Sequence, residues 1–146
     1  MPSALVNTEI AIGTLLVLVL VVLAITWFRR RYIAKGLQLT LCGTRPASDE
    51  RWRMGLIRFG DNALEWYALG GVSLRPKHRW ERQALRLEAP VMLIGADAIP
   101  VLPDAYKVEA SIAGGATFEL ALQGPAYTAL RSWQEAAPPG YNVNVA

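Results

Sequence analysis

The strongest pattern along the chain is a single long run of apolar residues near its N-terminus. Residues 10–28 carry no charge, and only Gly13, Thr14 and Thr26 interrupt the apolar side chains. At about 1.5 Å of rise per helical residue, 19 residues reach roughly 28 Å, close to the ~30 Å hydrocarbon core of a bilayer. The run is apolar on every side, which a helix tolerates when lipid or protein surrounds it. We therefore predict a transmembrane helix over residues 10–28.

The residues on either side of this run predict its orientation. Residues 1–9 contain Glu9 and no Lys or Arg, whereas four basic residues follow the run closely: Arg29, Arg30, Arg31 and Lys35. Basic residues beside a transmembrane helix favour the cytoplasmic side. We expect residues 1–9 to be a short extracytoplasmic N-terminus and residues 29–36 to be a basic juxtamembrane linker. The protein would cross the plasma membrane once, with its C-terminal domain in the cytoplasm.

A cleaved signal peptide and a buried core helix are the competing interpretations of the same run. A signal peptide has a basic N-terminal region and a small-residue cleavage site, but here Trp27-Phe28 and three arginines follow the run. A core helix of a soluble domain normally has a polar face, and this run has none. Both patterns favour an uncleaved membrane anchor.

After residue 36 the pattern changes to short alternations of apolar and polar residues, which are typical of strands. Apolar residues occupy every second position of 106–112 and of 118–122, and Gly114-Gly115 lies between them, which predicts a hairpin with one buried face. Residues 52–59 and 64–69 flank Gly60-Asp61-Asn62 and predict a second hairpin. Further strands are predicted at residues 37–42, 80–87, 91–94 and 99–102.

One helix is predicted in this C-terminal part. Pro125 suits the first turn of a helix, and Pro138-Pro139-Gly140 would end it. Between them one apolar stripe is formed by Ala126, Leu130, Trp133 and Ala137. This stripe should lie across the sheet. We therefore place a β-rich domain at residues 37–137 and a flexible tail at residues 138–146.

The order of six or seven short antiparallel strands and one C-terminal helix resembles the pleckstrin-homology-like barrel, in which that helix closes one open end. The residues that carry the resemblance are Phe118-Glu119-Leu120-Ala121-Leu122, followed by Leu130 and Trp133. The expected fold is therefore a single N-terminal transmembrane helix and a small antiparallel barrel or sandwich. The whole chain also resembles a family of small actinobacterial single-pass membrane proteins of unknown function.

The residues that most enzymes use are scarce. The chain has one cysteine, Cys42, and one histidine, His78, which excludes an intramolecular disulfide and multi-cysteine metal sites. No phosphate-binding loop, nucleophile elbow or zinc-protease motif is present. Cys42 lies in an apolar strand and is expected in the core, and His78 is expected on the surface between Lys77 and Arg79. We expect a protein that is not an enzyme and that needs no cofactor and no metal.

The charges are unevenly distributed along the chain. Residues 29–86 contain 13 Lys and Arg against five acids, whereas residues 87–146 contain two against six. The resemblance to pleckstrin-homology domains adds an expectation, because Arg51-Trp52-Arg53 is similar to part of their headgroup-binding signature, although Asp49 and Glu50 precede it. The residues predicted to contact lipid or a partner are Arg29, Arg30, Arg31, Lys35, Arg45, Arg51, Arg53, Arg75, Lys77, Arg79 and Arg82.

These patterns favour a membrane-tethered interaction module at the inner face of the plasma membrane. Its basic side would contact anionic lipid headgroups or a partner protein. The alternative is an accessory subunit of a larger membrane complex, which would pack on a membrane protein partner through its transmembrane helix. Nucleic acid is not an expected partner, because residues 37–146 contain 11 basic and 11 acidic residues.

Overall fold

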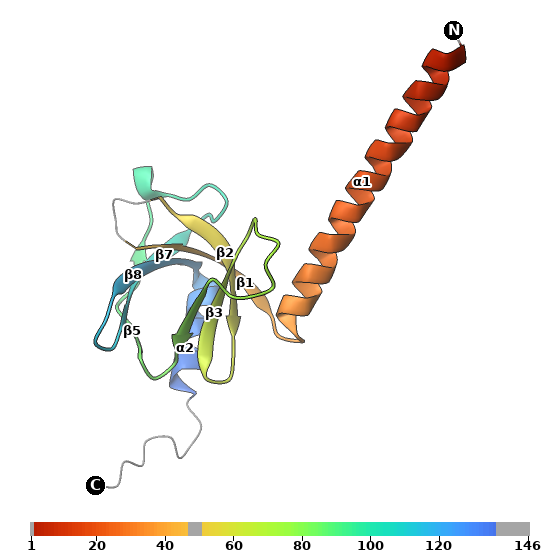
Figure 1. The fold of residues 1–146 in the computed structure, drawn as a ribbon. Helices are drawn as coiled ribbons and strands as arrows, with labels where there is room; N and C mark the ends of the chain where they lie inside the picture. Colours follow the sequence, from red (N-terminus) through yellow and green to blue (C-terminus); the bar gives the residue numbers. More distant parts are fainter. Residues whose placement is uncertain (1, 47–50, 137–146) are drawn as a thin grey trace, which may run out of the picture. The chain divides into compact units, whose positions relative to one another are not determined.

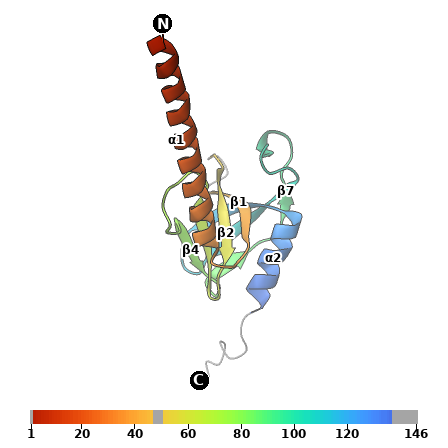
Figure 2. The same ribbon diagram turned by 90° about the vertical axis from the view of Figure 1, so that its right-hand side faces the viewer.

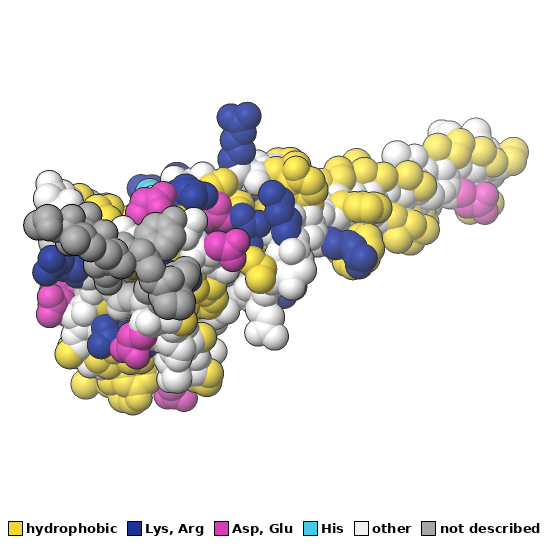
Figure 3. All heavy atoms as spheres, turned by 90° about the horizontal axis from the view of Figure 1, so that it is seen from below, with side chains coloured by type: hydrophobic (Ala, Val, Ile, Leu, Met, Phe, Trp, Pro, Cys, Tyr) yellow, Lys and Arg dark blue, Asp and Glu magenta, His cyan; other side chains and the backbone are white. Residues whose placement is uncertain are grey.

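The computed structural model describes residues 2–46 and 51–136 and divides the chain into two compact units, Met1–Gly36 and Leu37–Ala146 (Figure 1). The first unit is one helix, α1 (Pro2–Ala34). It is the one described helix that is long and apolar enough to cross a membrane, and hydrophobic side chains cover most of its visible side in Figure 3.

Helix α1 extends further than the apolar run. The residues predicted to form a basic linker are helical as far as Ala34, so Arg29, Arg30 and Arg31 belong to the last turns of the helix. Lys35 and Gly36 then take positive φ angles of 43° and 80°. This left-handed conformation ends the helix, and glycine adopts it without a steric cost.

The second unit is a strongly curved antiparallel sheet of eight strands (Figure 1). The strands are β1 (Leu39–Arg45), β2 (Arg53–Phe59), β3 (Ala63–Ala68), β4 (His78–Glu81), β5 (Leu85–Leu87), β6 (Val91–Met92), β7 (Ala105–Ile112) and β8 (Thr117–Gln123). Their order in the sheet is β4-β3-β2-β1-β8-β7-β5, and β6 also pairs with β7. The two edge strands, β4 and β5, are joined by residues 82–84 alone, so the sheet curls almost into a barrel. Helix α2 (Gly124–Glu135) follows β8.

This architecture confirms the predicted fold of one N-terminal apolar helix, a small antiparallel barrel-like sheet and one C-terminal helix. Both predicted hairpins are present, as β2–β3 and β7–β8. The first strand lies slightly later than predicted, at Leu39–Arg45.

Three of the short strand predictions are wrong in detail. Residues 80–87 do not form one strand, because a turn closed by the Ala84 N–H and the Glu81 carbonyl separates β4 from β5. Strand β4 pairs with β3, whereas β5 pairs with β7. Of residues 91–94 only Val91–Met92 is a strand, and both residues are exposed. In place of a strand at 99–102 there is an isolated bridge between Ile99 and Leu102.

The main core lies inside the curve of the sheet. Trp66, Trp80 and Phe118 are its large aromatic residues, and Trp80 stacks on Phe118 with 4.5 Å between ring centroids. Helix α2 packs against β7 and β8 and contributes Ala126 and Leu130 (Figure 2). Ala137, the last residue of the predicted stripe, lies outside the described residues, as does the predicted tail.

A second, smaller core lies on the other side of the sheet. The segment after β6 places Leu93, Ile99 and Leu102 over Ala105 and Ala121. Strand β8 is therefore buried from Phe118 to Leu122 without a break, and not on one face as the alternation predicted. Trp52 packs against this second core and also contacts the guanidinium of Arg45, which binds Glu119 of β8.

Candidate functional site

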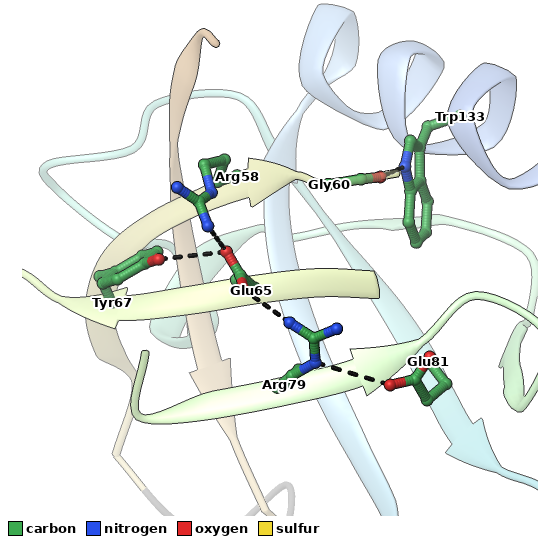
Figure 4. Close-up of polar contacts among 7 residues, drawn as sticks. All are labelled: Arg58, Gly60, Glu65, Tyr67, Arg79, Glu81 and Trp133. Atoms are coloured by element: carbon green, nitrogen blue, oxygen red, sulfur yellow. Dashed lines mark hydrogen bonds and ion pairs between the residues drawn. The ribbon is translucent and has the colours of Figure 1, made fainter. Parts of the chain in front are cut away.

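The basic residues of the barrel belong to four different environments, and the first is a ladder across β2, β3 and β4 that is centred on the buried Glu65 (Figure 4). Glu65 is directly opposite Arg58 on β2 and Arg79 on β4. Its carboxylate accepts hydrogen bonds from both guanidinium groups, with 2.9 Å to the Nη1 atom of Arg79. The hydroxyl of Tyr67 donates to the same carboxylate at 3.1 Å, and Arg79 also lies 3.5 Å from Glu81.

The energetics of this ladder follow from burial. A carboxylate out of water needs charged partners to offset its lost hydration, and Glu65 is only 6% exposed. Burial and the adjacent charge of Glu65 raise the pKa of Tyr67, which keeps its phenol protonated as a donor. Arg79 was predicted to contact lipid or a partner, but its guanidinium is held between Glu65 and Glu81.

A second ladder crosses β1, β8 and β7 and contains another predicted contact residue. Arg45 lies beyond the strand predicted at residues 37–42, but it is the last residue of β1 and is only 4% exposed. Its Nε donates to the buried carboxylate of Glu119, and its guanidinium lies 4.1 Å from the ring centroid of Trp52. Lys107 is 3.5 Å from the same carboxylate. The structure therefore makes Arg45 a buried ion-pair partner and contradicts its assignment to an exposed basic face.

Arg82 is the third predicted contact residue whose guanidinium binds within the fold. It stacks on the indole of Trp133 at 4.6 Å and donates to the Ala136 carbonyl at 3.1 Å. The indole N–H of Trp133 in turn donates to the Gly60 carbonyl at 2.6 Å (Figure 4). Arg82 thus links the turn between β4 and β5 to the end of α2.

The remaining predicted cations of the barrel are exposed and lie around one end of the β2–β3–β4 sheet. We call them the cation cluster, and they are Arg51, Arg53, Arg75 and Lys77. Arg53 begins β2 and Lys77 immediately precedes β4. Strand β3 is antiparallel to both β2 and β4, so the first residues of β2 and β4 lie beside the last residues of β3. Arg53 and Lys77 therefore flank the end of β3. None of the four forms an ion pair with an acid among residues 2–46 and 51–136.

The one histidine, His78, lies next to the cation cluster in the chain. His78 stacks on Trp80 at 5.5 Å, with 6° between the ring planes. Burial lowers the pKa of His78, and the charges of Lys77 and Arg53 lower it further. Lys77 and Arg53 therefore both disfavour the charged form of this imidazole.

A family described as "Protein of unknown function (DUF2550)" matches residues 16–140, which is most of the chain. The chain belongs to the DUF2550 family. No curated protein and no solved structure matches it. The DUF2550 match begins within α1 and continues past α2, so it covers both units.

The other predicted contact residues of this DUF2550 chain lie in the first unit. Arg29, Arg30, Arg31 and Lys35 occupy the end of α1 and the residue after it. Arg31 lies 5.5 Å from the ring centroid of Trp27, and the ammonium of Lys35 lies 5.7 Å from that of Tyr32. Cations and aromatic rings therefore alternate along this end of the helix, as is typical of a membrane interface.

The structure offers no cluster of metal ligands within the part of the chain that it describes. Cys42 is fully buried, and burial raises the pKa of its thiol, so its environment is that of a core residue as predicted. The sequence interpretation missed the role of Glu65 and Glu119, which divide the basic residues into paired and exposed groups. For Glu65 a signal existed, because pairing the predicted strand ends Phe59 and Leu64 places Glu65 opposite Arg58.

Proposed function

We propose that this protein is a non-enzymatic module, tethered to the inner face of the plasma membrane, whose cation cluster contacts anionic lipid headgroups. The observation that carries the proposal is the division of charges on the barrel. Arg45, Arg79 and Arg82 are held by internal partners, whereas Arg51, Arg53, Arg75 and Lys77 are exposed around one end of the sheet. Exposed cations of this kind attract the negative surface of a cytoplasmic leaflet.

The short connection between the two units supports the proposal. Only residues 35–38 separate α1 from β1, and four residues span at most about 14 Å when fully extended. If α1 is an anchor, the barrel stays close to the bilayer surface. Tethering raises the effective concentration of headgroups, so weak contacts suffice.

The orientation and the wider relationship are parts of the same proposal. The basic residues after the apolar run favour a cytoplasmic barrel and an extracytoplasmic N-terminus. The near-closed sheet followed by one helix supports a pleckstrin-homology-like domain. The proposed actinobacterial origin of the family rests on the resemblance of the sequence alone.

Liposome flotation of a fragment of residues 37–146 tests the headgroup contact, with near-UV circular dichroism to verify that the fragment is folded. The fragment should float with vesicles that contain anionic lipid and remain unbound with neutral ones. Replacing Arg75 or Lys77 by Gln should weaken binding about five-fold each, since a basic residue near an anionic surface contributes roughly 1 kcal/mol. Arg86→Gln is the matched control, because Arg86 is exposed on β5 outside the cation cluster.

The proposal fails if flotation does not depend on anionic lipid, or if Arg86→Gln weakens binding as much as Arg75→Gln. A folded fragment that binds no vesicle would point instead to a partner protein at the cation cluster.

A further inference from the structure

We propose that the connection between β3 and β4, residues 69–77, inserts its apolar side chains into the headgroup and acyl boundary of an anionic leaflet. The inference rests on the proposed function and adds a second kind of contact to it. Within six residues this loop exposes three apolar side chains, with exposed fractions of 52% for Leu69, 80% for Val72 and 47% for Leu74.

The charge of the loop indicates which surface it fits. Residues 69–77 contain no acid, and Arg75 and Lys77 follow the three apolar residues directly. Arg53 begins β2 at the same end of the sheet, where Gly55 of β2 pairs with Ala68 at the end of β3. A loop of exposed apolar residues that contains cations and no acid matches the two layers of an anionic leaflet, in which phosphate groups lie above acyl chains.

The base of the loop is fixed, so its apolar tip is presented by the barrel itself. The Leu69 N–H donates to the Met54 carbonyl at 3.2 Å, and the Lys77 N–H donates to the Trp66 carbonyl at 2.8 Å. Between these two bonds the loop has no strand partner among the described residues. A loop held at both ends loses less conformational entropy on insertion than a free segment would.

A second exposed apolar surface on the barrel lacks this combination and provides the control. Val91, Ile94 and Val101 are 57%, 73% and 63% exposed. Asp97 and Asp104 lie in the same segment, and it contains no Lys or Arg between residues 88 and 106. Carboxylates beside apolar residues are repelled by anionic lipid, so this surface should stay in water.

The test uses the full chain in lipid nanodiscs, with the environment-sensitive dye NBD on Val72→Cys or, as the control, on Ile94→Cys. Cys42 is fully buried and should not react. In discs with anionic lipid, NBD at residue 72 should shift to shorter wavelength and lose quenching by aqueous iodide. In neutral discs, and at residue 94 in either disc, it should remain in water. Adding Arg75→Gln and Lys77→Gln should abolish the shift, whereas Arg86→Gln should not.

Energy transfer from the same NBD to rhodamine on the headgroups separates the two proposals. Transfer that rises with anionic lipid while NBD at residue 72 stays quenchable would overturn insertion and leave headgroup contact standing. Transfer that does not respond to anionic lipid would overturn both. Equal blue shifts at residues 72 and 94 would also overturn the inference, because they would show that any exposed apolar residue enters the bilayer.

Discussion

Both arginines of the first ladder bind Glu65, so we expect Glu65→Gln to destabilise the barrel by about 3 kcal/mol, the lower end of the cost of breaking a buried ion pair. The substitution keeps the shape of the side chain but removes the charge that binds Arg58 and Arg79. Arg58 is only 12% exposed on its side chain, so its guanidinium cannot recover full hydration. Urea unfolding of the full chain in detergent, followed by tryptophan fluorescence, measures the change.

Glu81→Gln is the matched control for that substitution. Glu81 also contacts Arg79, but its side chain is 61% exposed, and exposed ion pairs contribute between about 0 and 1 kcal/mol. Equal effects of the two substitutions would contradict the view that burial makes Glu65 important.

The pKa of the one histidine, His78, offers a way to measure the electrostatic effect of the cation cluster. We expect the pKa of His78 to lie below its ordinary value of 6.5, because burial and the charges of Lys77 and Arg53 disfavour the imidazolium. Lys77→Gln and Arg53→Gln should each raise the pKa, the first by more, and Arg86→Gln should leave it unchanged. An NMR titration of the single imidazole of the chain gives these values. If Arg53→Gln leaves the pKa of His78 unchanged, Arg53 does not act on His78 together with Lys77.

How far such residue roles can be predicted depends on sequence separation. The pair of Arg58 and Glu65 lies one residue beyond the predicted strand ends Phe59 and Leu64, so the register of the predicted hairpin suffices to find it. The pair of Arg45 and Glu119 joins β1 to β8 across 74 residues. No local pattern indicates that β8 lies beside β1, so Arg45 in the sequence looks like any arginine before a loop.

At the scale of elements, the close packing of β2 against β3 makes one glycine sensitive. A Cβ atom on Gly55 would clash with the indole of Trp66 and the carbonyl of Tyr67. We therefore expect Gly55→Ala to destabilise the barrel by about 1–3 kcal/mol, the usual cost of overpacking a core. Urea unfolding of the full chain again provides the measurement.

Gly70→Ala is the matched control in the loop that follows β3. A Cβ atom there meets nothing within 4 Å, and the backbone is not in the left-handed region. The substitution should be neutral or should stabilise by up to about 1 kcal/mol through the unfolded chain. A loss at Gly70 equal to that at Gly55 would show that the clash is not the cause.

The elements that the sequence predicted well are those with long alternations or clear turns. The β7–β8 hairpin has both, and so has the β2–β3 hairpin. Residues 80–87 have alternation without a glycine or proline to mark the break, and the turn that separates β4 from β5 is fixed by pairing with β3 and β7. The edges of a curled sheet are set by tertiary pairing, which local pattern does not record.

On the scale of the whole molecule, the net charge of +3 belongs to the helical unit. Residues 1–36 contain four basic residues and one acid, whereas residues 37–146 contain 11 of each. The barrel is neutral overall, yet its acids at Glu65 and Glu119 are buried beside cations. A neutral domain can therefore present an exposed basic end, and total charge is a poor guide to its partners.

The same distribution of charge leads to a prediction of membrane topology. If the basic end of α1 faces the cytoplasm, a membrane-impermeant maleimide should label Ser3→Cys in intact cells and Gln83→Cys only after the cells are permeabilised. Both positions are exposed in the structure. Cys42 serves as an internal control, because burial raises the pKa of its thiol and the reactive thiolate does not form.

Replacing Arg29, Arg30 and Arg31 by Gln should weaken the preference for this orientation, since cytoplasmic cations set the orientation of a transmembrane helix. Labelling of Gln83→Cys in intact cells would reverse the orientation and place the cation cluster outside the cytoplasm, away from the leaflet that we propose it contacts.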